Sequence, residues 1–164
     1  MKLESLRGLL FEQLQDLYSA EDQITEALPK IIDNTTDPQL RVALNEHLEV
    51  TRKQIARLDK IFDEIPDVDR DDETCEGMEG LIKEGSEILK AKGDSETRDA
   101  GIIAAAQRVE HYEIAGYGCA RTYAQLLGRR DWAQLLQQTL DEEKEADQKL
   151  NLLAERINVE AKAA

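Results

Sequence analysis

The stretch AAAQRVEHYEIAGYG, residues 104–118, combines small apolar residues with a polar centre. Read as a helix of 3.6 residues per turn, it places Glu110 and Glu113 on the same face as Ala106 and Tyr117. That face carries apolar side chains and should be buried. Because a buried carboxylate is costly unless a partner neutralises it, the rest of the chain must supply that partner.

The composition of the 164-residue chain favours helices in one domain. Hydrophobic residues make up 41% of the chain and charged residues 34%, whereas aromatic residues make up only 4%. This length allows a single substantial core, so residues 1–164 are predicted to form one domain. The abundance of Ala, Leu, Glu, Gln and Lys indicates an all-α fold.

The charge of the chain excludes some partners. Asp and Glu number 35 against 21 Lys and Arg, giving a formal net charge of −14, which repels nucleic acid and anionic membranes. No apolar run resembles a signal peptide or approaches the ~20 residues that cross a bilayer, so we expect a cytoplasmic protein. Cys75 and Cys119 belong to no paired motif, and both are expected to be buried thiols.

Four long segments carry apolar residues at three- and four-residue steps, which predicts helices at about residues 2–33, 39–63, 96–127 and 131–157. A shorter helix is predicted at about residues 74–92, and Asp37 and Pro38 form a start signal for the second long helix. Short connections join the long helices into two antiparallel hairpins, and a long crossover carrying the short extra helix joins the hairpins. This is the ferritin-like form of the four-helix bundle.

Each long helix turns polar near the middle of its apolar stripe. No Lys or Arg lies on these stripes, so ion pairs are not the expected partners of the inward acids. Carboxylates with a single imidazole suit two iron ions, or alternatively manganese, better than structural zinc. The predicted metal ligands are Glu21, His47, Glu110, Glu113, Glu143 and Asp147, with Gln54 and Tyr117 beside them.

Other interpretations of single residues stay open. Glu21 or Glu143 alone could extend to solvent at the edge of a stripe, and His47 alone could be a hydrogen-bonded core histidine. Asp147 could hydrogen-bond a ligand instead of binding metal. His111 points about 100° away from Glu110 and is expected beside the site or at an interface.

Several segments resemble the YciE/YciF-type proteins of the ferritin-like superfamily, in order and spacing. They are DLYSAEDQI (16–24), HLEVTRKQIARLDKIF (47–62), EGMEGLIKEG (76–85), RDAGIIAAAQRVEHYEIAGYG (98–118) and TLDEEKEADQKL (139–150). The resemblance implies a bacterial, cytoplasmic, stress-associated protein, a rubrerythrin-like bundle with a di-metal centre, and a homodimer. The chain departs from the common di-iron pattern because it has no Glu-x-x-His; residues 110–113 form Glu-x-x-Glu, as in rubrerythrins.

Two functions from different classes follow. The first is a dinuclear iron or manganese centre that performs redox chemistry on peroxide or oxygen, as a peroxidase- or ferroxidase-like oxidoreductase would. Paired cysteines of a rubredoxin-type donor are absent, so such an activity needs an external reductant. The second is a metal-free structural or interaction protein of the stress response, and the sequence does not decide whether the chain is an enzyme.

Overall fold

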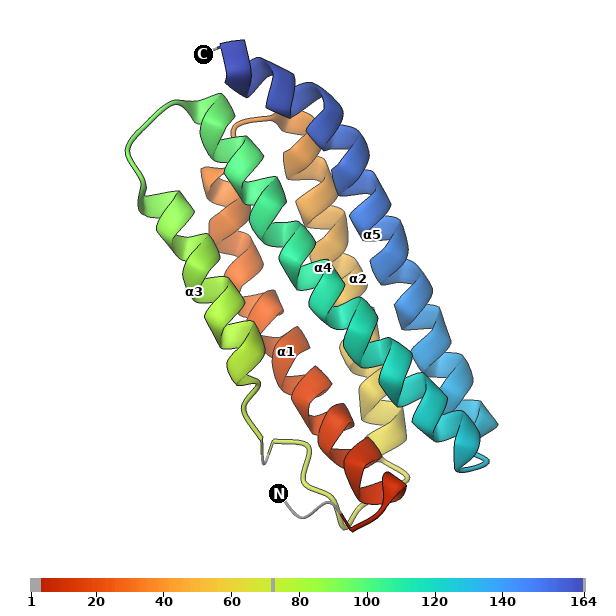
Figure 1. Cartoon of the computed structure of the whole chain (residues 1–164). Helices are drawn as coiled ribbons and strands as arrows, with labels where there is room; N and C mark the ends of the chain where they lie inside the picture. The colour runs from red at the N-terminus through yellow and green to blue at the C-terminus, as the bar shows by residue number, and fades with distance from the viewer. Residues whose placement is uncertain (1–3, 72, 164) are drawn as a thin grey trace.

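The computed structural model describes residues 4–71 and 73–163, which contain five α-helices and no strand. The helices are α1 (Leu6–Asn34), α2 (Pro38–Phe62), α3 (Glu76–Lys90), α4 (Ser95–Leu126) and α5 (Arg130–Ala163) (Figure 1). The all-α prediction is therefore confirmed for these residues. No helix in this part of the chain is both long enough and apolar enough to cross a membrane.

The four long helices lie side by side, and the shorter α3 lies outside them against α1 and α4 (Figure 1). α1 and α2 run antiparallel, as do α4 and α5, and each pair is joined by a short loop. α1 also packs against α4, and α2 packs against α5. The connection from α2 to α4 runs the length of the molecule and carries α3. Side chains from all four long helices consequently meet in one interior.

The beginnings of α1 and α2 are set by side chains that accept hydrogen bonds from the first free backbone N–H groups. Asp37 caps α2 in this way and Pro38 is its first residue, as predicted. α1 begins at Leu6, later than the predicted residue 2, because the Ser5 hydroxyl accepts from the N–H of Gly8 at 3.0 Å. The predicted helical residues 2–3 lie outside the described residues.

The far end of α5 also differs from its predicted boundary. The helix runs to Ala163, past the predicted end at residue 157. Residues 158–163 contain neither Gly nor Pro, so nothing in the chain stops the helix there.

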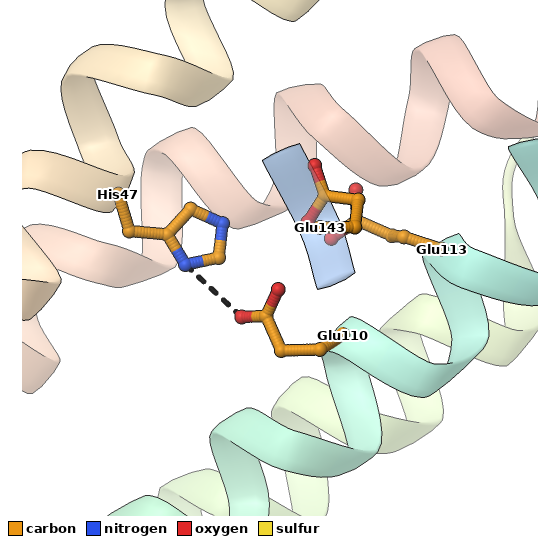
Figure 2. A group of neighbouring side chains, drawn as sticks. All are labelled: His47, Glu110, Glu113 and Glu143. Atoms are coloured by element: carbon orange, nitrogen blue, oxygen red, sulfur yellow. Dashed lines mark ion pairs between the residues drawn. The ribbon is translucent and has the colours of Figure 1, made fainter. Parts of the chain in front are cut away.

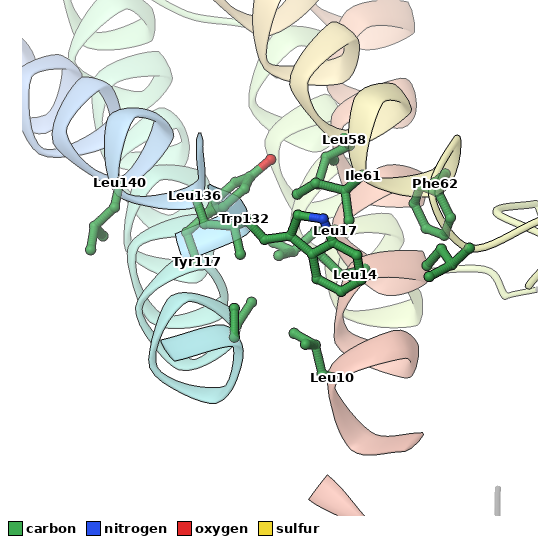
Figure 3. Close-up of a cluster of buried hydrophobic side chains, with 13 residues drawn as sticks. Leu10, Leu14, Leu17, Leu58, Ile61, Phe62, Tyr117, Trp132, Leu136 and Leu140 are labelled. Carbon is green, nitrogen blue, oxygen red and sulfur yellow. The ribbon is translucent and has the colours of Figure 1, made fainter. Parts of the chain in front are cut away.

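The apolar core falls into two clusters. The first gathers around Leu14, Leu17 and Trp132 near the loop between α4 and α5 (Figure 3). The second lies towards the other end of the long helices and includes Leu28 and Leu150. On α4 and α5 the two clusters are separated by a short interval of buried polar residues. That interval is the level at which the inward-facing acids predicted from the sequence lie.

Two burial expectations were wrong. Cys75 is buried as expected, but Cys119 is exposed on α4. Arg57 is only 8% exposed, although no basic residue was expected on the inward-facing stripes of the long helices. Its guanidinium pairs with Glu142 and donates to the hydroxyl of Thr139 at 2.9 Å, so its charge has a partner of its own.

Candidate metal centre

Four of the predicted ligands come together between the long helices. His47 on α2, Glu110 and Glu113 on α4, and Glu143 on α5 each offer one ligand atom, and these atoms lie within 4.8 Å of one another. Figure 2 shows the imidazole and the three carboxylates pointing into a common space. The side chain of His47 is 9% exposed, and the three glutamates are almost completely buried.

The other two predicted ligands, Glu21 and Asp147, do not belong to this group of four. Glu21 on α1 is fully buried, and its carboxylate accepts a hydrogen bond from the hydroxyl of Tyr117. Asp147 lies outside the group of four: its oxygens accept from Gln107 at 3.3 Å and from Asn151 at 3.2 Å.

His111, which the sequence placed beside the site or at an interface, has a largely exposed side chain. Its Nε2 lies 3.4 Å from an oxygen of Asp147. This contact ties His111 to the rim around Asp147 and not to the four converging side chains.

Most polar atoms of the centre have no hydrogen-bond partner among the described residues. These atoms are both oxygens of Glu110 and of Glu113, one oxygen each of Glu21 and Glu143, and Nε2 of His47. The Nδ1 of His47 lies 3.1 Å from Glu110 Oε1. A buried acceptor left unsatisfied costs about 1–3 kcal/mol, and more when it is charged. Converging hard oxygen donors with one imidazole are the chemistry that iron and manganese prefer, so the residues fit such a metal.

The acids raise one another's pKa values. Burial, and then the charge of Glu143, raise the pKa of Glu113 well above its usual value. Burial and Glu110 do the same for Glu143. Burial raises the pKa of Glu21 to about 7, even though the Tyr117 hydrogen bond and His47 oppose the shift. The carboxyl groups therefore cannot all ionise near neutral pH unless a positive charge lies among them.

The pKa of His47 is raised, which is the direction that a neighbouring carboxylate favours. Burial alone would lower its pKa, but the charge of Glu110 and contact with its carboxylate raise it. Since a metal ligand must be an unprotonated imidazole, binding of a cation competes with protonation of this group.

Two polar side chains donate hydrogen bonds to acids of this site. The amide of Gln54 on α2 donates to Glu143, and the hydroxyl of Tyr117 on α4 donates to Glu21. Both side chains are fully buried beside these acids. The burial of Arg57, one turn beyond Gln54 on α2, was not predicted from the sequence. Its three-residue spacing from Gln54 was the signal that could have placed it on the inner face.

Comparison with known proteins identifies the relatives of the chain. A family model described as "Domain of unknown function (DUF892)" matches residues 5–163. Protein YciF of Escherichia coli K12 is 44% identical over 154 residues, covering 94% of this chain and 93% of YciF. The crystal structure of the E. coli stress protein YciF superposes with a TM-score of 0.90 at 42% identity, over 94% of this chain and 98% of that one.

A second solved structure is equally close. YcfI of Rhodopseudomonas palustris, provisionally described as a structural protein, superposes with a TM-score of 0.87 at 43% identity, over 92% of this chain and 95% of that one. The chain therefore belongs to the DUF892 family and is a homologue of the E. coli stress protein YciF.

Proposed function

We propose that the chain is a ferritin-like stress protein that holds a dinuclear iron or manganese centre between its long helices. The observation that carries this proposal is the convergence of Glu110, Glu113 and Glu143 with His47, where most of the buried carboxylate oxygens have no hydrogen-bond partner among the described residues. The pairing of α1 with α2 and of α4 with α5, with α3 in the crossover, supports the ferritin-like topology.

Charge balance favours two metals over one. The proposed ligands are Glu21, His47, Glu110, Glu113 and Glu143. With the imidazole neutral, their four ionised carboxylates are balanced by two divalent cations, whereas one cation would leave excess negative charge in a buried site. Asp147 is left out of the ligand set because it lies outside the group of four and both of its oxygens accept hydrogen bonds, whereas Glu21 and Glu143 each keep one oxygen without a donor among the described residues.

A pair of redox-active metals, when bound, supplies the two electrons that reduction of peroxide requires. The protein's own contribution is to position the ligands and to exclude water. Gln54 and Tyr117 fix the orientation of Glu143 and Glu21, and the two apolar clusters enclose the acids from both ends. With no paired cysteines in the chain, electrons must come from an external reductant. A homodimer and a cytoplasmic location stay predictions.

Metal analysis of protein purified without chelator tests the proposal. We expect close to two metals per chain, and a clear loss of metal in the Glu113→Ala and Glu143→Ala variants. Glu155→Ala serves as the control, because Glu155 is an exposed acid on the same helix as Glu143. Peroxide consumption by the metal-loaded protein then separates an enzyme from a passive metal store.

The second candidate is a metal-free structural or interaction protein. The observation that favours it is the description of the relative YcfI as structural. Metal content well below one per chain, unchanged by Glu113→Ala or Glu143→Ala, would support this candidate and refute the dinuclear centre.

A further inference from the structure

A cavity of about 160 Å³ lies between α2 and α5, directly beside the candidate metal centre. Its lining begins at the surface with the exposed side chains of Glu46, Glu145 and Lys149. It ends inside the molecule at His47 and Glu143, which belong to the centre. The cavity thus connects the outer surface to the buried acids.

The inner end of this cavity carries unpartnered polar atoms. The Nε2 of His47 and one oxygen of Glu143 have no hydrogen-bond partner among the described residues. The side chain of His47 is 9% exposed and Glu143 is 1% exposed. Atoms of this kind need a polar or charged ligand, because leaving them bare costs stability.

The charge of the lining favours a cation as that ligand. Acidic side chains outnumber basic ones, and the single lysine, Lys149, forms an ion pair with Glu46. Glu145 forms no ion pair within the part of the chain that the structure describes. A cleft lined by excess negative charge raises the local concentration of cations and speeds their arrival.

Both helices contribute small or medium-sized apolar side chains to the lining of the cavity. α2 contributes Ala43 and Val50 to the lining, and α5 contributes Ala146. A second cavity also reaches His47 and Glu110, but apolar residues of α1, α3 and α4, such as Ile24, line most of it. A hydrated cation would lose its water there without polar replacement, so the second cavity suits it poorly.

We propose that divalent cations reach the centre through the cavity between α2 and α5, attracted by Glu145 and received by His47 and Glu143. This inference rests on the proposed metal-binding function and names the path and the class of ligand that uses it. Blocking the path should therefore slow metal uptake without changing the final amount of bound metal.

The first test compares Val50→Phe with Val42→Phe. Both positions lie on α2, but Val42 is 56% exposed and does not line the cavity. The rate of Co²⁺ uptake by chelator-treated protein is followed by visible absorption, and the endpoint by elemental analysis. Because the phenyl ring of Val50→Phe would fill part of the cavity, we expect this variant to slow uptake by about tenfold and Val42→Phe to leave it unchanged.

The second test compares Glu145→Gln with Glu155→Gln, two exposed positions on α5 of which only Glu145 lines the cavity. We expect Glu145→Gln alone to slow Co²⁺ uptake at low ionic strength, with the difference vanishing at high salt. If Val50→Phe does not fold, the comparison of Glu145→Gln with Glu155→Gln still tests the proposed path. Equal rates within the folded pairs, at full metal content, would overturn the path while leaving the centre intact. No uptake by the unchanged protein would overturn the proposed function, and the path with it.

Discussion

Replacing Glu21 with glutamine should stabilise the metal-free protein and weaken the metal-bound one. Glu21 is fully buried, one of its oxygens accepts from Tyr117, and the other has no hydrogen-bond partner in the part of the chain that the structure describes. Glutamine preserves the size of the side chain and an acceptor for the Tyr117 hydroxyl. It removes the ionisable carboxyl group, which is the part that opposes folding when no metal is present.

The pKa of Glu21 gives the magnitude. Burial raises it from 4.5 to about 7, so the folded protein holds this proton more tightly than the unfolded chain does. The associated stability is present below the unfolded value and is lost as the pH rises through about 7. A difference of this size corresponds to about 3 kcal/mol in the free energy of unfolding. The unchanged metal-free protein should lose that much more stability towards alkaline pH than the Glu21→Gln variant.

Urea unfolding of chelator-treated protein, at a pH near the unfolded value and again about one unit above the folded one, measures this difference. Repeating the experiment with saturating Mn²⁺ should reverse the order, because the variant lacks one carboxylate ligand and gains less from bound metal. Identical pH dependence of the two proteins, or equal stabilisation of both by Mn²⁺, would refute the reasoning.

Three further predictions concern Tyr117, which contacts Glu21, and two positions away from the candidate centre, Asp99 and Gly77. Tyr117→Phe leaves an oxygen of Glu21 without its donor and should cost about 1–3 kcal/mol in urea unfolding. Asp99→Ala removes the carboxylate that accepts from two backbone N–H groups between α1 and α2, at 2.9 and 2.6 Å. It should cost about 3 kcal/mol and leave metal content unchanged. Gly77→Ala would place a Cβ 2.7 Å from the ring of Tyr112, so it should lower the melting temperature without affecting metal content. Elemental analysis and thermal unfolding check all three, and loss of metal in Asp99→Ala or Gly77→Ala would contradict them.

The sequence predicted the helices well because their buried faces repeat leucine and isoleucine at helical spacing. Asp37 and Pro38 marked the start of α2 because their chemistry acts locally, on adjacent backbone groups. The boundary at residue 157 was wrong because the apolar stripe ends there while the helix does not. Residues 158–163 are helical because of their helix propensity and not because of burial. A pattern of buried apolar residues does not predict such an extension.

The placement of the site residues shows the limit of spacing alone. Asp147 follows Glu143 by one helical turn, so the pattern treats the two acids alike. The structure turns Asp147 towards Gln107 and Asn151, whose amides donate to both of its carboxylate oxygens. Among the described residues, only one oxygen of Glu143 has a donor, the amide of Gln54. Asn151 lies on α5 with Asp147, but Gln107 comes from α4, and the periodicity of α5 alone does not describe a contact with another helix.

Arg57 escaped prediction for a related reason. No Lys or Arg was expected on the inward-facing stripes, yet the long side chain of Arg57 lies largely buried against Glu142 and Thr139. The partners that make this burial possible come from α5, far along the chain. The charge patterning of α2 alone gives no sign of them.

Anomalous diffraction from crystals of the iron- or manganese-loaded protein is the most direct test of the proposed dinuclear centre. We expect two anomalous peaks about 3.5–4 Å apart. They should lie among the side chains of Glu21, His47, Glu110, Glu113 and Glu143. The absence of peaks between the long helices in crystals soaked with saturating metal, or peaks only at exposed acids, would contradict it.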